Sequence, residues 1–132
     1  MGEIAAKKGD YVMATDIHIV MLPAPPGPPA PTPVPHPFNG MINGNLSPTV
    51  KIMGRAAATV GSTVANQPIH IPQGGPFQKP PANQGKIIKG SATVRINNRP
   101  AARSGDTALT CNDPADLPGG VVQAAGTVFI GG

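Results

Sequence analysis

The chain repeats one short pattern along its length, and a repeat constrains the fold strongly because it supplies its own alignment. The segment from Ser91 to Gly105 repeats the segment from Ser47 to Gly61 at a constant offset. Each copy starts with alternating β-branched residues and ends in a turn of small residues. A third such turn occupies residues 5–10, and a third strand-like segment occupies residues 125–132. The pattern therefore predicts three related units of strand, turn and strand.

The first turn has no strand before it, and the last strand-like segment has no turn after it. We therefore expect a closed arrangement, in which the C-terminal strand completes the unit that the N-terminus begins. Period-2 alternation of Val and Ile with polar residues predicts half-buried strands. Frequent Gly and Pro argue against any long helix, although a short helical turn near Thr63–Asn66 stays open.

Composition predicts a weak core in a single domain over residues 1–132. The chain has three Phe, one Tyr and no Trp, so small aliphatic side chains must fill its interior. A fold of this kind needs a staple, and Cys111, the single cysteine, excludes an internal disulfide.

Charge and hydropathy narrow the function classes. Lys and Arg are scattered without aromatic interleaving, so we expect no nucleic-acid binding. The N-terminus has no apolar segment typical of a signal peptide, and no run predicts a membrane span. We expect a protein made in the cytoplasm and not stably inserted in a membrane.

Residues 23–37 contain nine prolines and favour polyproline II structure. Repeat elements lie on both sides of this segment, which argues for an insertion within one domain rather than a linker. A linker or a ligand for a proline-binding module is the simpler alternative. We expect a stiff loop that wraps the body and delivers His36.

Three loops place metal-binding residues at related positions. His18 and His70 each lie eight residues after the end of their turn, and Cys111 lies five residues after the end of its own. Three units around a pseudo-threefold axis would bring these loops together, with His36 added by the proline segment. Three His and one Cys suit a closed tetrahedral zinc site. If Cys111 were only a buried thiol, the three histidines would leave an open, hydrolytic type of site.

Signatures of catalysis are missing elsewhere. The sequence has neither GxSxG nor a phosphate-binding GxxxxGK[ST] motif. Asp106, Asp113 and Asp116 read as turn residues, and Arg103 is expected to pair with Asp106 or a carbonyl, or to lie in solvent. We therefore predict a protein that is not an enzyme.

The turn Pro100-Ala101-Ala102-Arg103 and its strand context resemble the PAAR-repeat family over nearly the whole chain. The strand phrase of residues 91–98, its degenerate copy from Ser47 and the ending of residues 126–131 carry the same resemblance. It implies a small conical all-β structure that caps the spike of a contractile injection machine, either a type VI secretion system or a related phage-tail-like particle. It also implies one structural zinc near the apex, with the ligand roles falling on His18, His36, His70 and Cys111.

The other copies depart from the motif. Ala56 replaces the proline, Thr59 and Lys7 replace the arginine, and Ser62 replaces the aspartate. Such loss favours a role in shaping the backbone over a role in catalysis.

The resemblance also sets expectations about partners. The base of a monomeric cone would cap a trimeric β-helical spike of the VgrG-like or phage-spike-like type. The last strand ends at the C-terminus, so we expect no fused toxin and only non-covalent effectors, exported with the apparatus. A small zinc hydrolase with an open His₃ site and a proline-loop adaptor are the alternatives.

Overall fold

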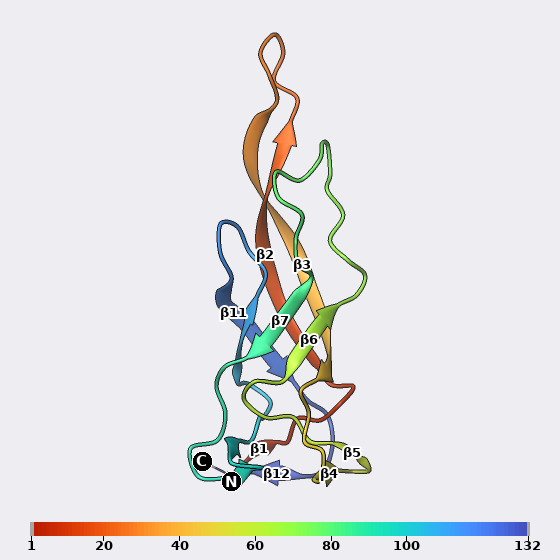
Figure 1. Ribbon diagram of the computed structural model, residues 1–132, viewed down its shortest axis with the longest axis vertical. Coiled ribbons are helices and arrows are strands. Elements are labelled where there is room, and N and C mark those ends of the chain that lie inside the picture. The colour runs from red at the N-terminus through yellow and green to blue at the C-terminus, as the bar shows by residue number, and fades with distance from the viewer. Residues whose placement is uncertain (1, 132) are drawn as a thin grey trace.

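The computed structural model describes residues 2–131, and every regular element in this range is a β-strand. Figure 1 shows an elongated cone that carries both termini at its broad base and ends in a point formed by one hairpin. The expected all-β, conical fold is confirmed. Its twelve strands are β1 (Glu3–Ile4), β2 (Tyr11–Leu22), β3 (Ala30–Gly44), β4 (Lys51–Ile52), β5 (Arg55–Ala56), β6 (Thr63–Asn66), β7 (Gln84–Ile87), β8 (Arg95–Ile96), β9 (Arg99–Pro100), β10 (Thr107–Thr110), β11 (Leu117–Gln123) and β12 (Phe129–Ile130).

Three hairpins form the body of the cone. The pairs β2–β3, β6–β7 and β10–β11 close an antiparallel six-stranded barrel in the order β10-β11-β2-β3-β6-β7. One residue in two points inward along each strand, and in the lower barrel the inward set is mostly small and apolar, with a single large ring. The buried interior contains Val12, Phe38, Ile42, Val64, Ile87 and Val122.

A ring of hydrogen bonds joins the three repeats below the barrel. The amide of Ala6 donates to the carbonyl of Ala102, Ala102 donates to Ala58, and Ala58 donates to Ala6, each at 3.0 Å. All three alanines are fully buried. Only a small side chain fits where three backbones approach this closely, so the repeated Ala-Ala marks the pseudo-threefold axis.

The base consists of three two-stranded sheets, β4–β5, β8–β9 and β1–β12. The third sheet joins the two ends of the chain, with Glu3 opposite Ile130 and Ile4 opposite Phe129. The expected closure of the N-terminal unit by the C-terminal strand therefore occurs. Each strand of these sheets is only two residues long, whereas the alternating sequence pattern predicted longer strands.

The proline-rich segment does not wrap the body. Residues 30–44 form β3, which pairs with β2 along its whole length, and residues 23–29 turn at the point of the cone (Figure 1). Pro31, Pro33, Pro35 and Pro37 occupy alternate positions, so their missing N–H groups all face the edge turned away from β2. A strand tolerates proline at such an edge, and this periodicity explains why the expected wrapping loop is wrong.

Two further features complete the fold. Residues Thr63–Asn66 form strand β6, so the helical turn left open there does not occur. Within residues 2–131 no helix has the length and hydrophobicity needed to cross a bilayer.

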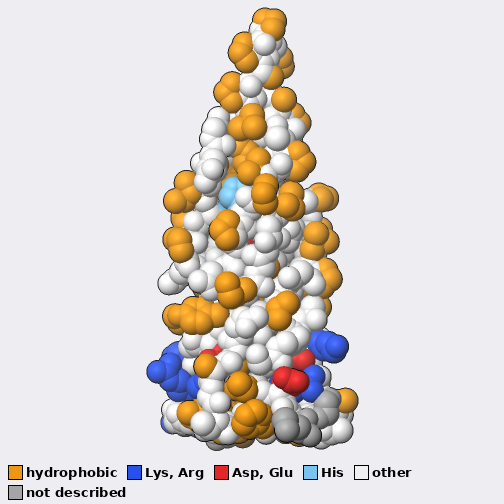
Figure 2. Space-filling view, turned by 180° about the vertical axis from the view of Figure 1, so that it is seen from behind, with side chains coloured by type: hydrophobic (Ala, Val, Ile, Leu, Met, Phe, Trp, Pro, Cys, Tyr) orange, Lys and Arg blue, Asp and Glu red, His pale blue; other side chains and the backbone are white. Residues whose placement is uncertain are grey.

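On the face shown in Figure 2, Lys and Arg side chains gather near the base, whereas apolar side chains continue to the point.

Candidate metal centre

A cluster of polar side chains fills the barrel where it narrows toward the point. Asp16 and His18 come from inward-facing positions of β2, and His36 lies directly opposite Asp16 on β3. His70 follows β6, and Cys111 follows β10. All five side chains are buried. The β2–β3 hairpin extends beyond the cluster, which therefore lies below the extreme point (Figure 1).

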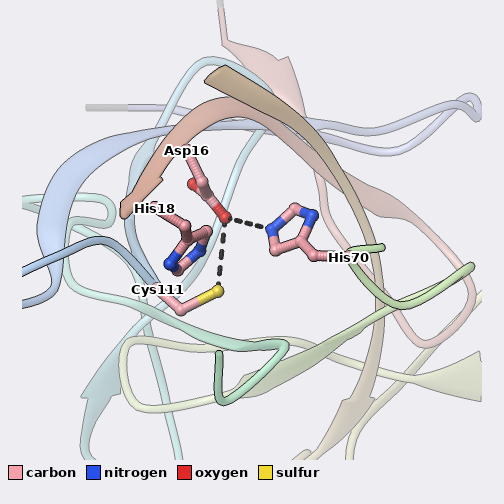
Figure 3. A group of neighbouring side chains, drawn as sticks. All are labelled: Asp16, His18, His70 and Cys111. Carbon is pink, nitrogen blue, oxygen red and sulfur yellow. Dashed lines mark hydrogen bonds and ion pairs between the residues drawn. The ribbon is translucent and has the colours of Figure 1, made fainter. Parts of the chain in front are cut away.

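Potential ligand atoms of four of these residues converge. One atom each from Asp16, His18, His70 and Cys111 lies within 4.8 Å of the others, and Figure 3 shows the four side chains facing one another. The His36 ring lies beside them, with its centroid 5.7 Å from that of His18 and 5.4 Å from that of His70. The predicted ligands His18, His36, His70 and Cys111 are thus neighbours, and Asp16 is an unexpected fifth member.

Aromatic rings enclose the three histidines. The Phe38 ring centroid is 6.2 Å from that of His70. The Phe77 ring lies 5.9 Å from His18 and 5.3 Å from His36. The imidazoles are therefore shielded from water by apolar surface, which strengthens any electrostatic interaction among them.

Several buried nitrogen atoms lack a hydrogen-bond partner. Within the described chain these are both ring nitrogens of His18 and the Nε2 atom of His36. The Nδ1 atom of His36 is 2.9 Å from the carbonyl of Val34 and donates to it, so Nε2 carries a free lone pair. An imidazole held in this way is typical of a metal ligand. Leaving such atoms unpartnered costs about 1–3 kcal/mol each, so their presence points to a bound cation.

Asp16 lies at the centre of the remaining contacts. Its Oδ2 atom accepts from His70 Nε2 at 2.8 Å and from Cys111 Sγ at 3.3 Å (Figure 3). Its Oδ1 atom accepts from the Thr110 hydroxyl at 2.6 Å and from the Asn112 amide at 3.4 Å. Sequence reasoning missed Asp16, although its position two residues before His18 places both on the same face of a strand.

Burial shifts the protonation of two donors. Burial, together with the neighbouring Asp16, raises the pKa of the Cys111 thiol to about 12. Burial also lowers the pKa of His18, although the Asp113 carboxylate, 3.5 Å from Nδ1, opposes the shift. The metal-free protein therefore holds a neutral thiol and a neutral imidazole. Metal binding would release the thiol proton, because thiolate is the ligand form.

The PAAR turn itself lies at the base, away from these donors. Arg103 pairs with Asp106 through a contact of 2.8 Å between Nη2 and Oδ1, which is one of the three alternatives that the sequence left open. Lys7 and Asp10 form the same pair at the first corner, with 3.2 Å between Nζ and Oδ2. At the second corner the uncharged Ser62 hydroxyl takes the place of the carboxylate and accepts from a backbone amide.

The sequence predicted Asp113 and Asp116 to be turn residues, and the structure places them in different environments. Asp113 accepts from the backbone amide of Ile19 at 2.8 Å and lies beside His18, so it links β2 to the loop after β10. Asp116 is exposed on the same loop.

The donors present fit zinc. Imidazole nitrogen, thiolate sulfur and carboxylate oxygen are the ligands that zinc takes in proteins, and the orphaned histidine nitrogens give them a common target. The ligand roles of His18, His36, His70 and Cys111 stay a prediction.

Comparison with known families gives one match. A family model described as the PAAR motif matches the chain over residues 33–109 and 77–132, which together make up most of its length. A comparison with curated proteins found no match.

Proposed function

The chain belongs to the PAAR-motif family, and on this premise we propose that it is the structural tip of a contractile injection machine, of the type VI or a related phage-tail-like kind. The observation that carries the proposal is the closed ring of Ala6, Ala58 and Ala102. A single chain folded about a pseudo-threefold axis offers three similar surfaces. It therefore matches the end of a trimeric β-helical spike, and one monomer would cap three subunits.

The base is the surface that would meet the spike. Its three sheets present strand ends at corresponding positions, and such edges pair readily with other strands. Phe129 on β12 and Met53 after β4 are large apolar residues left exposed there, at 58% and 53%. An exposed apolar rim of this kind favours a protein partner.

One structural zinc ion would staple the narrowing part of the cone. His18, His36, His70 and Cys111 would hold it, joining β2, β3 and the loops that follow β6 and β10. When bound, the ion supplies a tetrahedral cross-link and no open position for substrate. Because the core contains one large buried ring, Phe38, this link would add substantially to the stability of the upper cone.

The site geometry favours this role over hydrolysis. The cavity next to the donors, lined by His18, Cys111 and Asp113 among others, has a volume of about 60 Å³. Binding sites for organic ligands are usually ~300–1,000 Å³, so this cavity suits water or an entering ion rather than a substrate. X-ray absorption that shows sulfur bound to zinc would exclude the open His₃ site.

The adaptor alternative requires a partner for the proline hairpin. Because His36 lies on β3, deletion of residues 23–37 would damage the donor cluster as well as the hairpin. The clean variant replaces residues 21–31 with a two-residue Asn-Gly turn, which keeps Val20 opposite Thr32. An adaptor would lose its partner in this variant, whereas a spike tip would still bind through its base.

The remaining features of the proposal concern context. The protein would be a single-domain monomer before assembly and would leave the cell with the machine. Effectors would dock on it non-covalently.

The test is co-purification with a trimeric β-helical spike protein from the same genome. We expect a stable complex of one tip per spike trimer, weakened at least tenfold by Phe129→Asp at the base. Leu117→Asp is the matched control, because Leu117 is similarly exposed, at 51%, on the side strand β11. Failure of the unaltered protein to bind, or equal loss with both variants, would refute docking through the base.

A further inference from the structure

We propose that Asp16 belongs to the metal centre as the residue that balances the charge of a divalent ion bound by the neighbouring donors. This inference rests on the proposed metal staple. It adds a fifth residue to the three histidines and one cysteine.

The first argument is the burial of the Asp16 carboxylate. Asp16 is fully buried, and its hydrogen-bond donors are a hydroxyl, an amide, a thiol and the His70 imidazole, which lies 2.8 Å away and forms an ion pair only when protonated. Lys7 and Arg103 are paired with other acids at the base. A His70 ring that bound a metal ion would be neutral, and a buried carboxylate without a cationic partner is strongly unfavourable. In the metal-bound protein the ion would therefore be the cation that offsets Asp16.

The second argument is that the two carboxylate oxygens of Asp16 make different contacts. Oδ1 is anchored to the barrel wall by the Thr110 hydroxyl and the Asn112 amide. Oδ2 faces the donors and contacts His70 and Cys111, as Figure 3 shows. Carboxylates in metal centres are commonly oriented by such hydrogen bonds. Asp16 is thus fixed in place with one oxygen turned toward the predicted ligands of the ion.

The third argument is the net charge of the centre. A divalent ion bound by three neutral imidazoles and one thiolate leaves one positive charge buried among Phe38, Phe77 and the barrel wall. Adding the Asp16 carboxylate brings the sum over the ion, these four ligands and Asp16 to zero. Asp113 is a further carboxylate near the cluster, 3.5 Å from His18 Nδ1, and it borders the small cavity beside the donors. A neutral centre is favoured in a low-dielectric interior, where an unbalanced charge is costly.

This proposal makes charge the quantity to test. We compare the affinity for Zn²⁺ with that for Cu⁺, both measured by competition with chelators, in the full chain. Cu⁺ accepts the same imidazole and thiolate donors but carries one charge less. Asp16→Asn preserves shape and removes the charge.

We expect Asp16→Asn to weaken Zn²⁺ binding by about 10–100-fold, the range found for outer groups of metal centres, and to weaken Cu⁺ binding much less. Thr110→Val is the matched variant, because it removes the anchor of Oδ1 but keeps the charge. It should weaken both ions equally and modestly. Asp10→Asn, a buried carboxylate at the base, should change neither affinity.

The outcomes separate this inference from the proposed function. If the unaltered protein binds zinc tightly and Asp16→Asn binds it equally well, or loses both ions in the same ratio, the charge-balancing role is wrong while the staple stands. If the unaltered protein binds no divalent ion, the staple and this inference both fail. Should Asp16→Asn not fold, an equal loss of both ions in Asp16→Ser, which also removes the charge, would overturn the role. A selective loss of Zn²⁺ in that variant supports it.

Discussion

Gly105 and Gly61 occupy equivalent corners of the cone and share a left-handed backbone, with φ of 91° and 97°. Gly9 completes the set at 94°. A side chain disfavours this conformation by about 1–2 kcal/mol. We therefore expect Gly105→Ala to lower the free energy of unfolding by that amount, as measured by urea denaturation.

The control for this prediction is Gly119→Ala. A Cβ atom at Gly105 or at Gly119 would meet nothing within 4 Å, and only Gly105 has positive φ. The two substitutions thus differ in backbone strain alone, and Gly119→Ala should change stability by less than about 0.5 kcal/mol. Equal effects would contradict the assignment of strain to the corner.

The corner carboxylate matters mainly as an acceptor for the backbone. Asp106 Oδ2 accepts from the Arg103 amide at 2.7 Å, and Ser62 Oγ accepts from the Thr59 amide at 3.0 Å. Asp106→Ala should cost about 1–3 kcal/mol, because a buried N–H loses its partner. Asp106→Ser should cost less, since the hydroxyl restores that bond.

The residues of the second corner also predict that the effects of substituting Arg103 and Asp106 on stability are coupled. Asp106→Ser leaves the Arg103 guanidinium unpaired, whereas the added change Arg103→Thr reproduces the residues of the second corner. The double variant should be more stable than Asp106→Ser alone, by thermal unfolding. Strictly additive losses would show that Arg103 and Asp106 are not energetically coupled and would contradict this prediction.

Removal of the metal should destabilise the cone through the donors that it joins. Ligand binding stabilises a fold by about 4 kcal/mol when the free ligand exceeds its dissociation constant a thousandfold. A strong chelator should therefore lower the melting temperature of the unaltered protein substantially. Cys111→Ser should melt near the chelated temperature and respond little to added zinc. A melting temperature that is insensitive to chelator in the unaltered protein would argue against a staple.

The buried His18 imidazole predicts a dependence on pH in the metal-free protein. The pKa of His18 is lowered in the fold by burial, so the unfolded chain takes up this proton at a higher pH. Its contribution is complete above the unfolded pKa, about 6.5, and is lost as the pH falls through the lowered folded value. Stability should fall by at most about 1.4 kcal/mol per pH unit from this group. His18→Gln should flatten that part of the profile, measured by urea unfolding between about pH 7.5 and 4.

The repeat allowed the architecture to be predicted because it aligned the chain with itself. The small residues at 5–6, 57–58 and 101–102 belong to the three turns that the repeat made equivalent, and in the structure they are buried alanines of the base. Closure by the two ends followed from the incomplete first and last units. These inferences needed spacing alone and no knowledge of side-chain contacts.

The proline segment and Asp16 were harder because their environment is not visible locally. Nine prolines suggested a stiff polyproline II loop that wraps the body, and the alternation of Pro31, Pro33, Pro35 and Pro37 was the overlooked sign of a strand edge. The amides of Ile17 and Ile19, opposite two of these prolines, turn outward to Asn112 and Asp113. A lone aspartate resembles any surface acid until long-range pairing buries it.

The proline hairpin also has a consequence for dehydration. Nine of the fifteen residues from 23 to 37 carry no backbone N–H, and residues 17–50 contain no Lys, Arg, Asp or Glu. An amide that leaves water without a partner costs several kcal/mol, and a formal charge costs far more. The point of the cone therefore has few donors to strip of water and no such charge to transfer. Its transfer into an apolar layer would therefore cost less free energy than that of an equally long hairpin with free amides and charged side chains.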